Sequence, residues 1–346
     1  MRRFLSFAAL LLAGCATTIE QPSATQVTTA VVAARGETVP VGTANADAAD
    51  DPAIWRNHRN PNASLIVATD KKAGLYVYGL DGRVRSFVTA GQVNNVDLLD
   101  LGRDGVLVVA SDRNDVATAK LQMYRLDTIA GKLVALGSAP GGAGEGYGVC
   151  LWRSGSDVFA FSVLKEGAVH QVRLDPRAGS GTIVRTLRVA TQPEGCVVDP
   201  RSAQLYVGEE AAGIWRFDAR RSAPTGGELV ARVDTKRLFA DVEGLALAPR
   251  GRTGGYLVAS SQGDNAYVVY SLPDVRFVGR FRIGPGRFDG TEETDGIGLV
   301  LGDFGPQYPG GLLVVQDGLE QPAEGGERQN FKLVAWRDVK QALQLK

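Results

Sequence analysis

Short apolar segments separated by polar turns fill most of the chain, and they recur in the same order six times. Each repeat begins with a polar residue and an apolar strand, turns, and returns as a second apolar strand that ends in a polar cluster, as in LIVATDKK (65–72) and VLVVASDR (106–113). The first strands of the repeats read DDPAIW (50–55), NNVDLL (94–99), GYGVCLW (146–152), PEGCVV (193–198), VEGLAL (242–247) and TDGIGLV (294–300). Only the C-terminal WRDVKQALQLK has a helical pattern.

The repeat length predicts the fold. With Asp51, Asp97, Tyr147, Glu194, Glu243 and Asp295 as markers, the repeats are 46 to 52 residues long. This period is typical of a β-propeller blade, whereas a tandem of β-sandwiches needs about 100 residues per domain. The sequence therefore predicts an all-β, six-bladed β-propeller with four-stranded antiparallel blades around a central channel. We expect the run TQVTTAVVAA (25–34) to add an outer strand to the last blade.

Polar residues occur at matching places in every repeat. Because neighbouring strands of a blade are antiparallel, the start of its first strand and the end of its second strand meet at one rim. The side chains expected at this mouth are nine acids, four bases and one phenol: Asp50, Asp51, Asp97, Glu194, Glu209, Glu210, Glu243, Asp295, Asp317, Lys71, Lys72, Arg113, Lys165 and Tyr147. Capping of strand ends is the simpler explanation for any one of them, but not for all six repeats.

The residue types at this mouth indicate metal and phosphate chemistry. Clustered carboxylates repel one another unless cations lie between them. Oxygen ligands without His or Cys favour Ca²⁺ over zinc or copper, and Lys and Arg beside them suit phosphate oxygens. The chain has 38 basic and 38 acidic residues, so no overall positive charge points to nucleic acid. Its two histidines and its cysteines lie outside the motifs of histidine, cysteine and purple-type phosphatases.

The N-terminus has the pattern of an export signal. Arg2 and Arg3 precede a short apolar stretch that ends in LLAGC, which resembles the lipobox of bacterial lipoproteins with Cys15 as the lipidated residue. Ordinary signal cleavage next to an incidental cysteine is the alternative. We expect a signal peptide over 1–14, a tether over 15–35 and the propeller over 36–346. The protein would then be exported and lipid-anchored at a bacterial cell envelope, with Ala16 fitting the outer membrane.

Two cysteines remain after Cys15. Cys150 and Cys196 fall on the predicted inner strands of adjacent blades, at nearly the same depth. Adjacent strands can bring Cα atoms within bridging distance, and an exported protein meets an oxidising compartment. We therefore predict a Cys150–Cys196 disulfide, with two buried free thiols as the alternative.

At these motifs the chain resembles the β-propeller phytases. The resemblance covers nearly the whole predicted mature chain and rests on motifs in matching order, among them DAADDPAIW (47–55), TDKKAGLYVYGLDG (69–82), GEEAAGIWRF (208–217), FDGTEETDGIGL (288–299) and QNFKLVAW (329–336). It implies a monomeric Ca²⁺-dependent enzyme that hydrolyses phytate, or its calcium complex, to lower inositol phosphates.

The resemblance also implies residue roles. Asp51, Glu194, Glu210, Glu243 and Asp295, with Tyr147 close by, would hold catalytic calcium ions. Lys71, Lys72, Arg113 and Lys165 would bind substrate phosphates, and Asp289 and Asp317 would hold a structural calcium in the last blade. Asp50, Asp97 and Glu209 are further candidate calcium ligands, directly or through water.

The expected mechanism is attack on phosphorus by a water that bridges calcium ions, with cations stabilising the leaving alkoxide. Two alternatives use the same fold: a calcium-stabilised binding propeller on the cell surface, and a lactonase-type hydrolase. The Lys and Arg set among the acids argues against both, since neither needs phosphate-binding groups.

Overall fold

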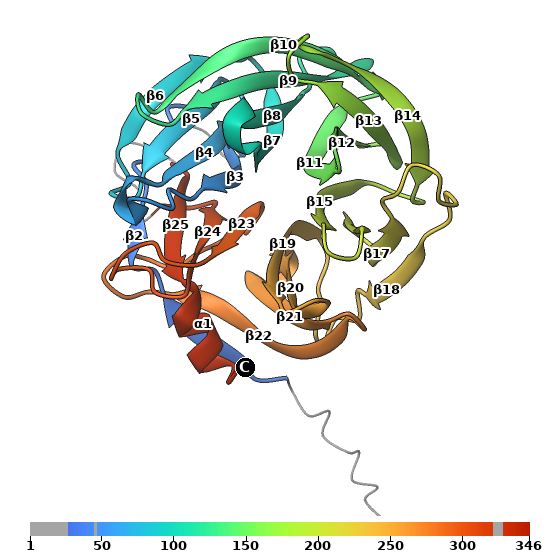
Figure 1. Ribbon diagram of the computed structural model, residues 1–346. Helices are drawn as coiled ribbons and strands as arrows, with labels where there is room; N and C mark the ends of the chain where they lie inside the picture. The colour runs from blue at the N-terminus through green and yellow to red at the C-terminus, as the bar shows by residue number, and fades with distance from the viewer. Residues whose placement is uncertain (1–26, 45–46, 321–327) are drawn as a thin grey trace, which may run out of the picture.

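The computed structural model describes residues 27–44, 47–320 and 328–346 and confirms the six-bladed propeller. Six sheets stand around a central channel (Figure 1). Counted from the channel outwards, the first blade consists of β3 (Ala49–Trp55), β4 (Leu65–Asp70), β5 (Gly74–Gly79) and β6 (Val84–Thr89). The second blade consists of β7 (Val93–Asp100), β8 (Val106–Asp112), β9 (Thr118–Asp127) and β10 (Lys132–Ala143). The third blade consists of β11 (Gly146–Ser154), β12 (Asp157–Leu164), β13 (Ala168–Asp175) and β14 (Ser180–Arg188).

The fourth and fifth blades repeat this plan. Their strands are β15 (Pro193–Asp199), β16 (Gln204–Glu209), β17 (Gly213–Asp218) and β18 (Glu228–Arg232), then β19 (Val242–Arg250), β20 (Gly254–Ser261), β21 (Ala266–Leu272) and β22 (Arg276–Gly284). The sixth blade contains β23 (Ile297–Leu301), β24 (Gly311–Asp317) and β25 (Asn330–Ala335) from the end of the chain. The short helix α1 (Trp336–Ala342) lies where the sequence pattern predicts it.

The N-terminal segment closes the ring, but not in the way the sequence suggested. Strand β1 (Thr29–Ala33) forms within the predicted run, yet it pairs in parallel with β22 of the fifth blade rather than with the last blade. The next strand, β2 (Gly36–Glu37), pairs with β25 and completes the sixth blade. The chain thus links two blades, and residues 29–33, which we assigned to the tether, belong to the propeller.

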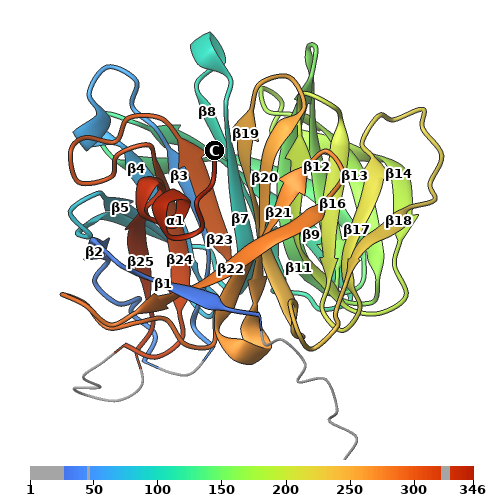
Figure 2. The same cartoon turned by 90° about the horizontal axis from the view of Figure 1, so that it is seen from below.

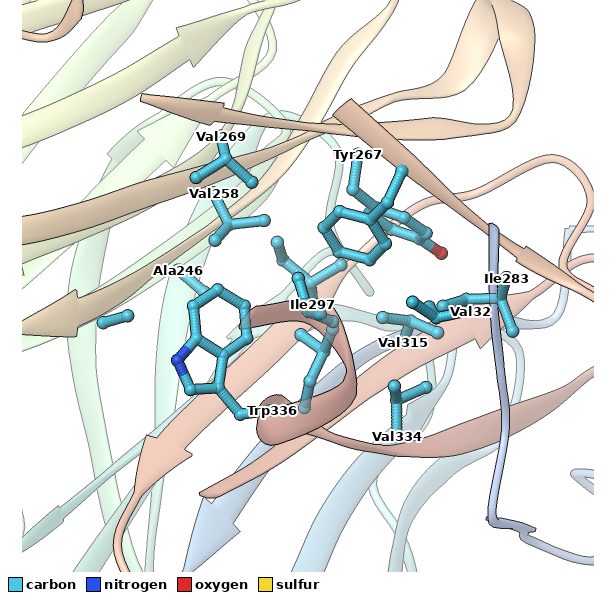
Figure 3. Packing of buried hydrophobic residues seen from close by; sticks show 14 of the residues in the cluster. Val32, Ala246, Val258, Tyr267, Val269, Ile283, Ile297, Val315, Val334 and Trp336 are labelled. Atoms are coloured by element: carbon cyan, nitrogen blue, oxygen red, sulfur yellow. The ribbon is translucent and has the colours of Figure 1, made fainter. Parts of the chain in front are cut away.

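Packing between the fifth and sixth blades fixes this closure. Val32 of β1, Phe281 of β22 and Trp336 of α1 share one buried apolar cluster with inner-strand residues of both blades (Figure 3). Burial of such large side chains stabilises by about 1.5–3 kcal/mol each, so the N-terminal strand is an integral part of the fold. No helix among the described residues is both long and apolar enough to cross a membrane.

The predicted disulfide is present between the third and fourth blades. Cys150 on β11 and Cys196 on β15 are bonded, with their Cα atoms 5.7 Å apart. Both side chains lie in the apolar cluster between these blades. The bond joins the two inner strands just below Tyr147 and Glu194.

Replacing both cysteines with serine will lower the free energy of unfolding by about 4 kcal/mol, because the bond closes a loop with a sequence separation of 46 residues. Urea unfolding of the oxidised protein and of the C150S/C196S variant measures the difference. Reduced wild-type protein should unfold at nearly the same urea concentration as the variant. Equal midpoints for the oxidised protein and the variant would contradict the prediction.

Candidate active site

A repeated backbone irregularity places the candidate site at the mouth of the channel. Each of the first five inner strands has a β-bulge at its mouth end, where the register with its partner shifts. Bulges of this kind turn side chains away from the regular pleat. The bulged pairs are Asp50–Asp51, Asn94–Asn95, Tyr147–Gly148, Glu194–Gly195 and Glu243–Gly244, and Asp295–Gly296 comes just before β23 in the sixth blade.

Glycine at the second bulge position lets neighbouring blades touch. A Cβ atom at Gly195 would lie 2.2 Å from the carbonyl oxygen of Glu243 in the next blade. At Gly148 it would lie 1.9 Å from the carbonyl oxygen of Glu194. A real Cβ does not fit at these distances, so glycine allows the backbone contact that brings the first-position side chains together.

Carboxylates from four blades meet in two groups at the mouth. Oxygens of Asp50, Glu194 and Asp295 lie within 4.8 Å of one another, and so do oxygens of Glu194, Glu210 and Glu243. Glu194 belongs to both groups, and its side chain is almost fully buried. The structure therefore gathers most of the carboxylates that the sequence assigned to catalysis, and it adds Asp50 to them.

These carboxylates are held in an environment that favours a proton or a metal cation. Burial, followed by the negative charge of Asp295, raises the pKa of Asp50 to about 7. Burial and the neighbouring carboxylates also raise the pKa values of Glu194 and Glu243 well above the usual range. A bound divalent cation would relieve the same repulsion.

Two buried oxygens in this site lack a hydrogen-bond partner. They are Oδ1 of Asp50 and Oε2 of Glu243. Buried polar atoms normally have partners, so carboxylate oxygens without a hydrogen bond, beside other carboxylates, fit a site that can bind a cation. The two groups contain only carboxylates, a donor set that suits Ca²⁺.

Asn94 forms hydrogen bonds both to the mouth carboxylates and to a predicted phosphate-binding base, and the sequence analysis did not select it. Its Nδ2 donates to Oδ2 of Asp50 at 3.2 Å and to Oε1 of Glu194 at 2.7 Å. Its Oδ1 accepts a hydrogen bond from the guanidinium of Arg113 at 2.6 Å. The signal was present in the sequence, since NN (94–95) occupies the place in its repeat that DD (50–51) occupies in the first.

Asp97 lies deeper in the channel than the bulges. Pro52 and Val96 are the first residues after the bulge in their blades, so Asp97 matches Ala53 rather than Asp51. Its Oδ1 accepts from the backbone N–H of Leu98 and its Oδ2 from that of Leu151 in the next blade, both at 2.7 Å. The structure does not bring Asp97 into either carboxylate group.

Asp97→Asn will therefore lower stability more than activity. One of its two backbone hydrogen bonds loses its acceptor, at a cost of about 1–2 kcal/mol. The phosphate-release rate should stay within about threefold of wild type when both are assayed below their melting temperatures. A hundredfold loss of rate with unchanged stability would instead make Asp97 part of the catalytic machinery.

Asp51 is the second residue of the first bulge, and its side chain forms a hydrogen bond to the backbone of the next blade. Its Oδ2 accepts from the backbone N–H of Val96 at 3.1 Å, and its own N–H donates to Oγ1 of Thr69. Burial, with the charge of Asp50 next, raises the pKa of Asp51 well above its usual value. Asp51 thus lies at the mouth, as predicted, but outside the two carboxylate groups.

Glu209 and Glu210 are adjacent in sequence but have different surroundings. Glu209 is bonded within its own blade, where its oxygens accept from Oγ1 of Thr191 at 2.7 Å and Nε1 of Trp215 at 2.6 Å. Although burial alone would raise it, these hydrogen bonds lower the pKa of Glu209. Glu210 instead joins Glu194 and Glu243 at the mouth.

The predicted phosphate-binding bases surround the carboxylates. The ammonium of Lys71 lies 2.8 Å from Oδ2 of Asp50 and 3.1 Å from Oδ2 of Asp295, and it also contacts Asp47. Lys72 pairs with Asp47 at 3.0 Å. Asp47, which the sequence analysis did not select, thus offers an anionic partner to both lysines.

The ring of Tyr147 contacts the other two predicted phosphate-binding bases, Arg113 and Lys165. The guanidinium carbon of Arg113 lies 5.8 Å from the centre of its ring, and Nζ of Lys165 lies 5.1 Å away. Both distances are in the range of cation–π contacts. Burial and nearby carboxylates raise the pKa of Tyr147 far above its usual value, so the phenol stays protonated.

A third group of acidic side chains lies in the last blade, apart from the two at the mouth. Oxygens of Glu37, Asp289 and Glu320 lie within 4.8 Å of one another. The buried ammonium of Lys332 contacts all three and lies 3.2 Å from Oδ2 of Asp317. Asp289 and Asp317, the predicted structural pair, are therefore together, and Glu37 connects β2 to them.

Two comparisons with known proteins point to one enzyme family. A model of the phytase family matches residues 2–346. A 3-phytase of Bacillus subtilis (strain 168) is 36% identical over 353 residues, which cover 97% of this chain and 91% of that protein.

Two solved structures are much less similar to this chain. A BBS1N chain in complex with ARL6DN covers 78% of this chain and 74% of its own length, at 11% identity and a TM-score of 0.47. A functionally unknown protein from Desulfotomaculum acetoxidans covers 67% of this chain and 71% of its own length, at 15% identity and a TM-score of 0.49. Neither carries a functional argument. The family model and the curated relative show that the chain belongs to the phytase family.

Proposed function

We propose that this protein is a calcium-dependent phytase that hydrolyses phytate to lower inositol phosphates and inorganic phosphate. The observation that carries the proposal is the pair of carboxylate groups at the mouth, joined through Glu194 and bordered by Lys71, Arg113 and Lys165. A cation site beside several bases suits a substrate with many phosphates.

Calcium would be held at the mouth by Asp50, Glu194, Glu210, Glu243 and Asp295. When bound there, it supplies positive charge for phosphate oxygens and for activation of water. In the last blade the ammonium of Lys332 balances one of the four negative charges of Glu37, Asp289, Asp317 and Glu320. A structural ion held by the same carboxylates would balance more of them and join the N-terminal strand to this blade.

The bases bind and orient the phosphates. Arg113 and Lys165 are held over Tyr147, so they are oriented before substrate arrives. Lys71 and Lys72 pair with Asp47 in the free protein, and a phosphate would replace that carboxylate. Several bases around one mouth can engage more than one phosphate of the same molecule, which increases affinity.

We further propose that the chain is an exported, monomeric lipoprotein anchored at the cell envelope. The support for export and anchoring is the LLAGC sequence that ends at Cys15, and the support for a monomer is the resemblance to the β-propeller phytases. Cys15 and the signal sequence lie outside the described residues. Mass spectrometry of the mature N-terminus would show a diacylglyceryl group on Cys15, and an unmodified N-terminus would contradict the anchor.

Substrate choice tests the proposed activity. Purified protein with millimolar calcium should release inorganic phosphate from phytate and should not open a sugar lactone. Binding of phytate without phosphate release would favour the binding propeller, and lactone opening without phosphate release would favour the other hydrolase.

A further inference from the structure

A basic cleft lies on the side of the propeller opposite the mouth. β25 runs from the mouth at Asn330 to the far face at Ala335, so α1 and the chain end lie away from the site described above (Figure 2). A cleft of about 680 Å³ opens there between α1 and the base of the fifth blade. Its basic residues are Arg250, Arg337, Lys340 and Lys346.

The cleft has more positive than negative groups, since the α-carboxylate of Lys346 can balance only one of its four bases. No acidic side chain lines it among the residues that the structure describes. Arg250, Arg337, Lys340 and Lys346 make no side-chain hydrogen bond or ion pair within the described parts of the chain; Asp338, on the same helix, pairs with Arg35 instead. Four positive side chains therefore face one space and lack protein partners.

The floor of the cleft is formed by larger, uncharged side chains. Trp336 is buried against the fifth blade, and Tyr256 is half-buried beside the chain end, where its hydroxyl accepts the backbone N–H of Lys346 at 3.0 Å. This contact anchors the last residue to β20. The basic side chains thus project from elements that are fixed to the fold.

We propose that this cleft is a second anion site that binds a phosphate-bearing molecule. Arginine presents a fork of donors that matches phosphate oxygens, and lysine adds positive charge. An acidic mouth and a basic cleft on opposite faces also give the molecule a charge asymmetry that its zero formal net charge conceals. The phosphate can come from a soluble inositol phosphate or from a lipid headgroup.

Binding to metal-free protein separates this cleft from the mouth. Without calcium the carboxylates at the mouth outnumber its bases and repel polyanions, so phytate should bind there much more weakly than in the cleft. Calorimetry of the full chain, stripped of metal on a chelating resin, should give one phytate per chain. Because no hydrolysis is measured, the result does not depend on the proposed activity.

The variant R337Q/K340Q removes two charges from the cleft and should weaken phytate binding at least tenfold with an unchanged melting temperature. The control R103Q/K132Q removes two exposed bases that do not line the cleft, and it should bind like wild type. Equal binding by R337Q/K340Q and wild type, or no binding by metal-free wild type, would overturn the proposal.

Vesicle sedimentation distinguishes the two sources of phosphate. Binding to phosphatidylglycerol vesicles in excess of binding to phosphatidylcholine vesicles, lost in R337Q/K340Q, would assign the cleft to a lipid headgroup. Phytate binding without this excess would assign it to soluble inositol phosphates. If R337Q/K340Q keeps both its phytate binding and its vesicle binding, neither source of phosphate binds in this cleft.

Discussion

Replacing Glu194 with Gln will lower the rate of phosphate release from phytate by about 1,000-fold, or about 4 kcal/mol of transition-state stabilisation. Glu194 is the one residue shared by the two carboxylate groups of the described structure, so one substitution removes a charge from both. Glutamine has the same shape and keeps an oxygen that can accept from Asn94. The fold should therefore survive while cation binding is weakened.

The matched control is Glu228→Gln. Glu228 pairs with Arg216 on the outer part of the fourth blade, far from the mouth, and its side chain is mostly exposed. Its loss removes the same charge and should leave the rate unchanged. Initial rates at saturating calcium, with circular dichroism to verify folding, compare the variants. A fully active E194Q enzyme would refute the site assignment.

Metal-free protein will lose stability, on the order of 4 kcal/mol, as the pH rises from about 5 to about 7. Burial raises the pKa of Asp50 to about 7 and that of Asp97 to about 6, and it raises those of Glu194 and Glu243 further. Unfolded carboxyl groups titrate near pH 4, so the folded state holds more protons between these values. Stability then falls as the pH rises through that window.

Burial also raises the pKa values of Asp51 and Asp295, and that of Asp317 to about 6, so these groups add to the fall. Groups with a lowered pKa act differently. Acids with a lowered pKa, such as Asp47, affect stability below about pH 4. Burial lowers the pKa of His170, which opposes the trend, but this is one half-buried side chain.

Urea unfolding at several pH values, with and without calcium, measures the effect. Bound calcium replaces the protons, so the calcium-loaded protein should show a much smaller fall. Asp50→Asn should also make the metal-free fall shallower. Metal-free stability that is constant or increases between pH 5 and 7 would contradict the prediction.

The repeat pattern was sufficient to predict the architecture and most of the mouth. Strand starts in equivalent positions on six blades must meet at one rim, so Glu194, Glu243 and Asp295 could be grouped from sequence alone. The Cys150–Cys196 bond followed from the same reasoning, because both residues fall on adjacent inner strands.

Register within a blade could not be read from spacing. A bulge adds a residue on one strand only, and repeats of variable length hide it. The sequence analysis therefore matched Asp97 with Asp51, whereas Asn95 takes that position and Asp97 bonds backbone amides. Glu209 lies at the mouth end of β16, but its side chain bonds Thr191 and Trp215 rather than the carboxylate groups, since alternate residues of a strand point to opposite faces.

The blade with which the N-terminal strand pairs also could not be predicted from the sequence. Its β-forming residues predicted a strand, but any blade with a free outer edge could accept it. Pairing with β22 depends on how Val32 packs against Phe281 and Trp336, which are far away in the chain.

The most direct test of the account is phosphate release from phytate by one protein sample in three states: with calcium, after removal of calcium with EDTA, and after calcium is restored. The proposed site predicts a high rate, then a rate near background, then recovery of most of the first rate. Phosphate release that continues at the full rate in EDTA would contradict the claim that the mouth carboxylates act through calcium.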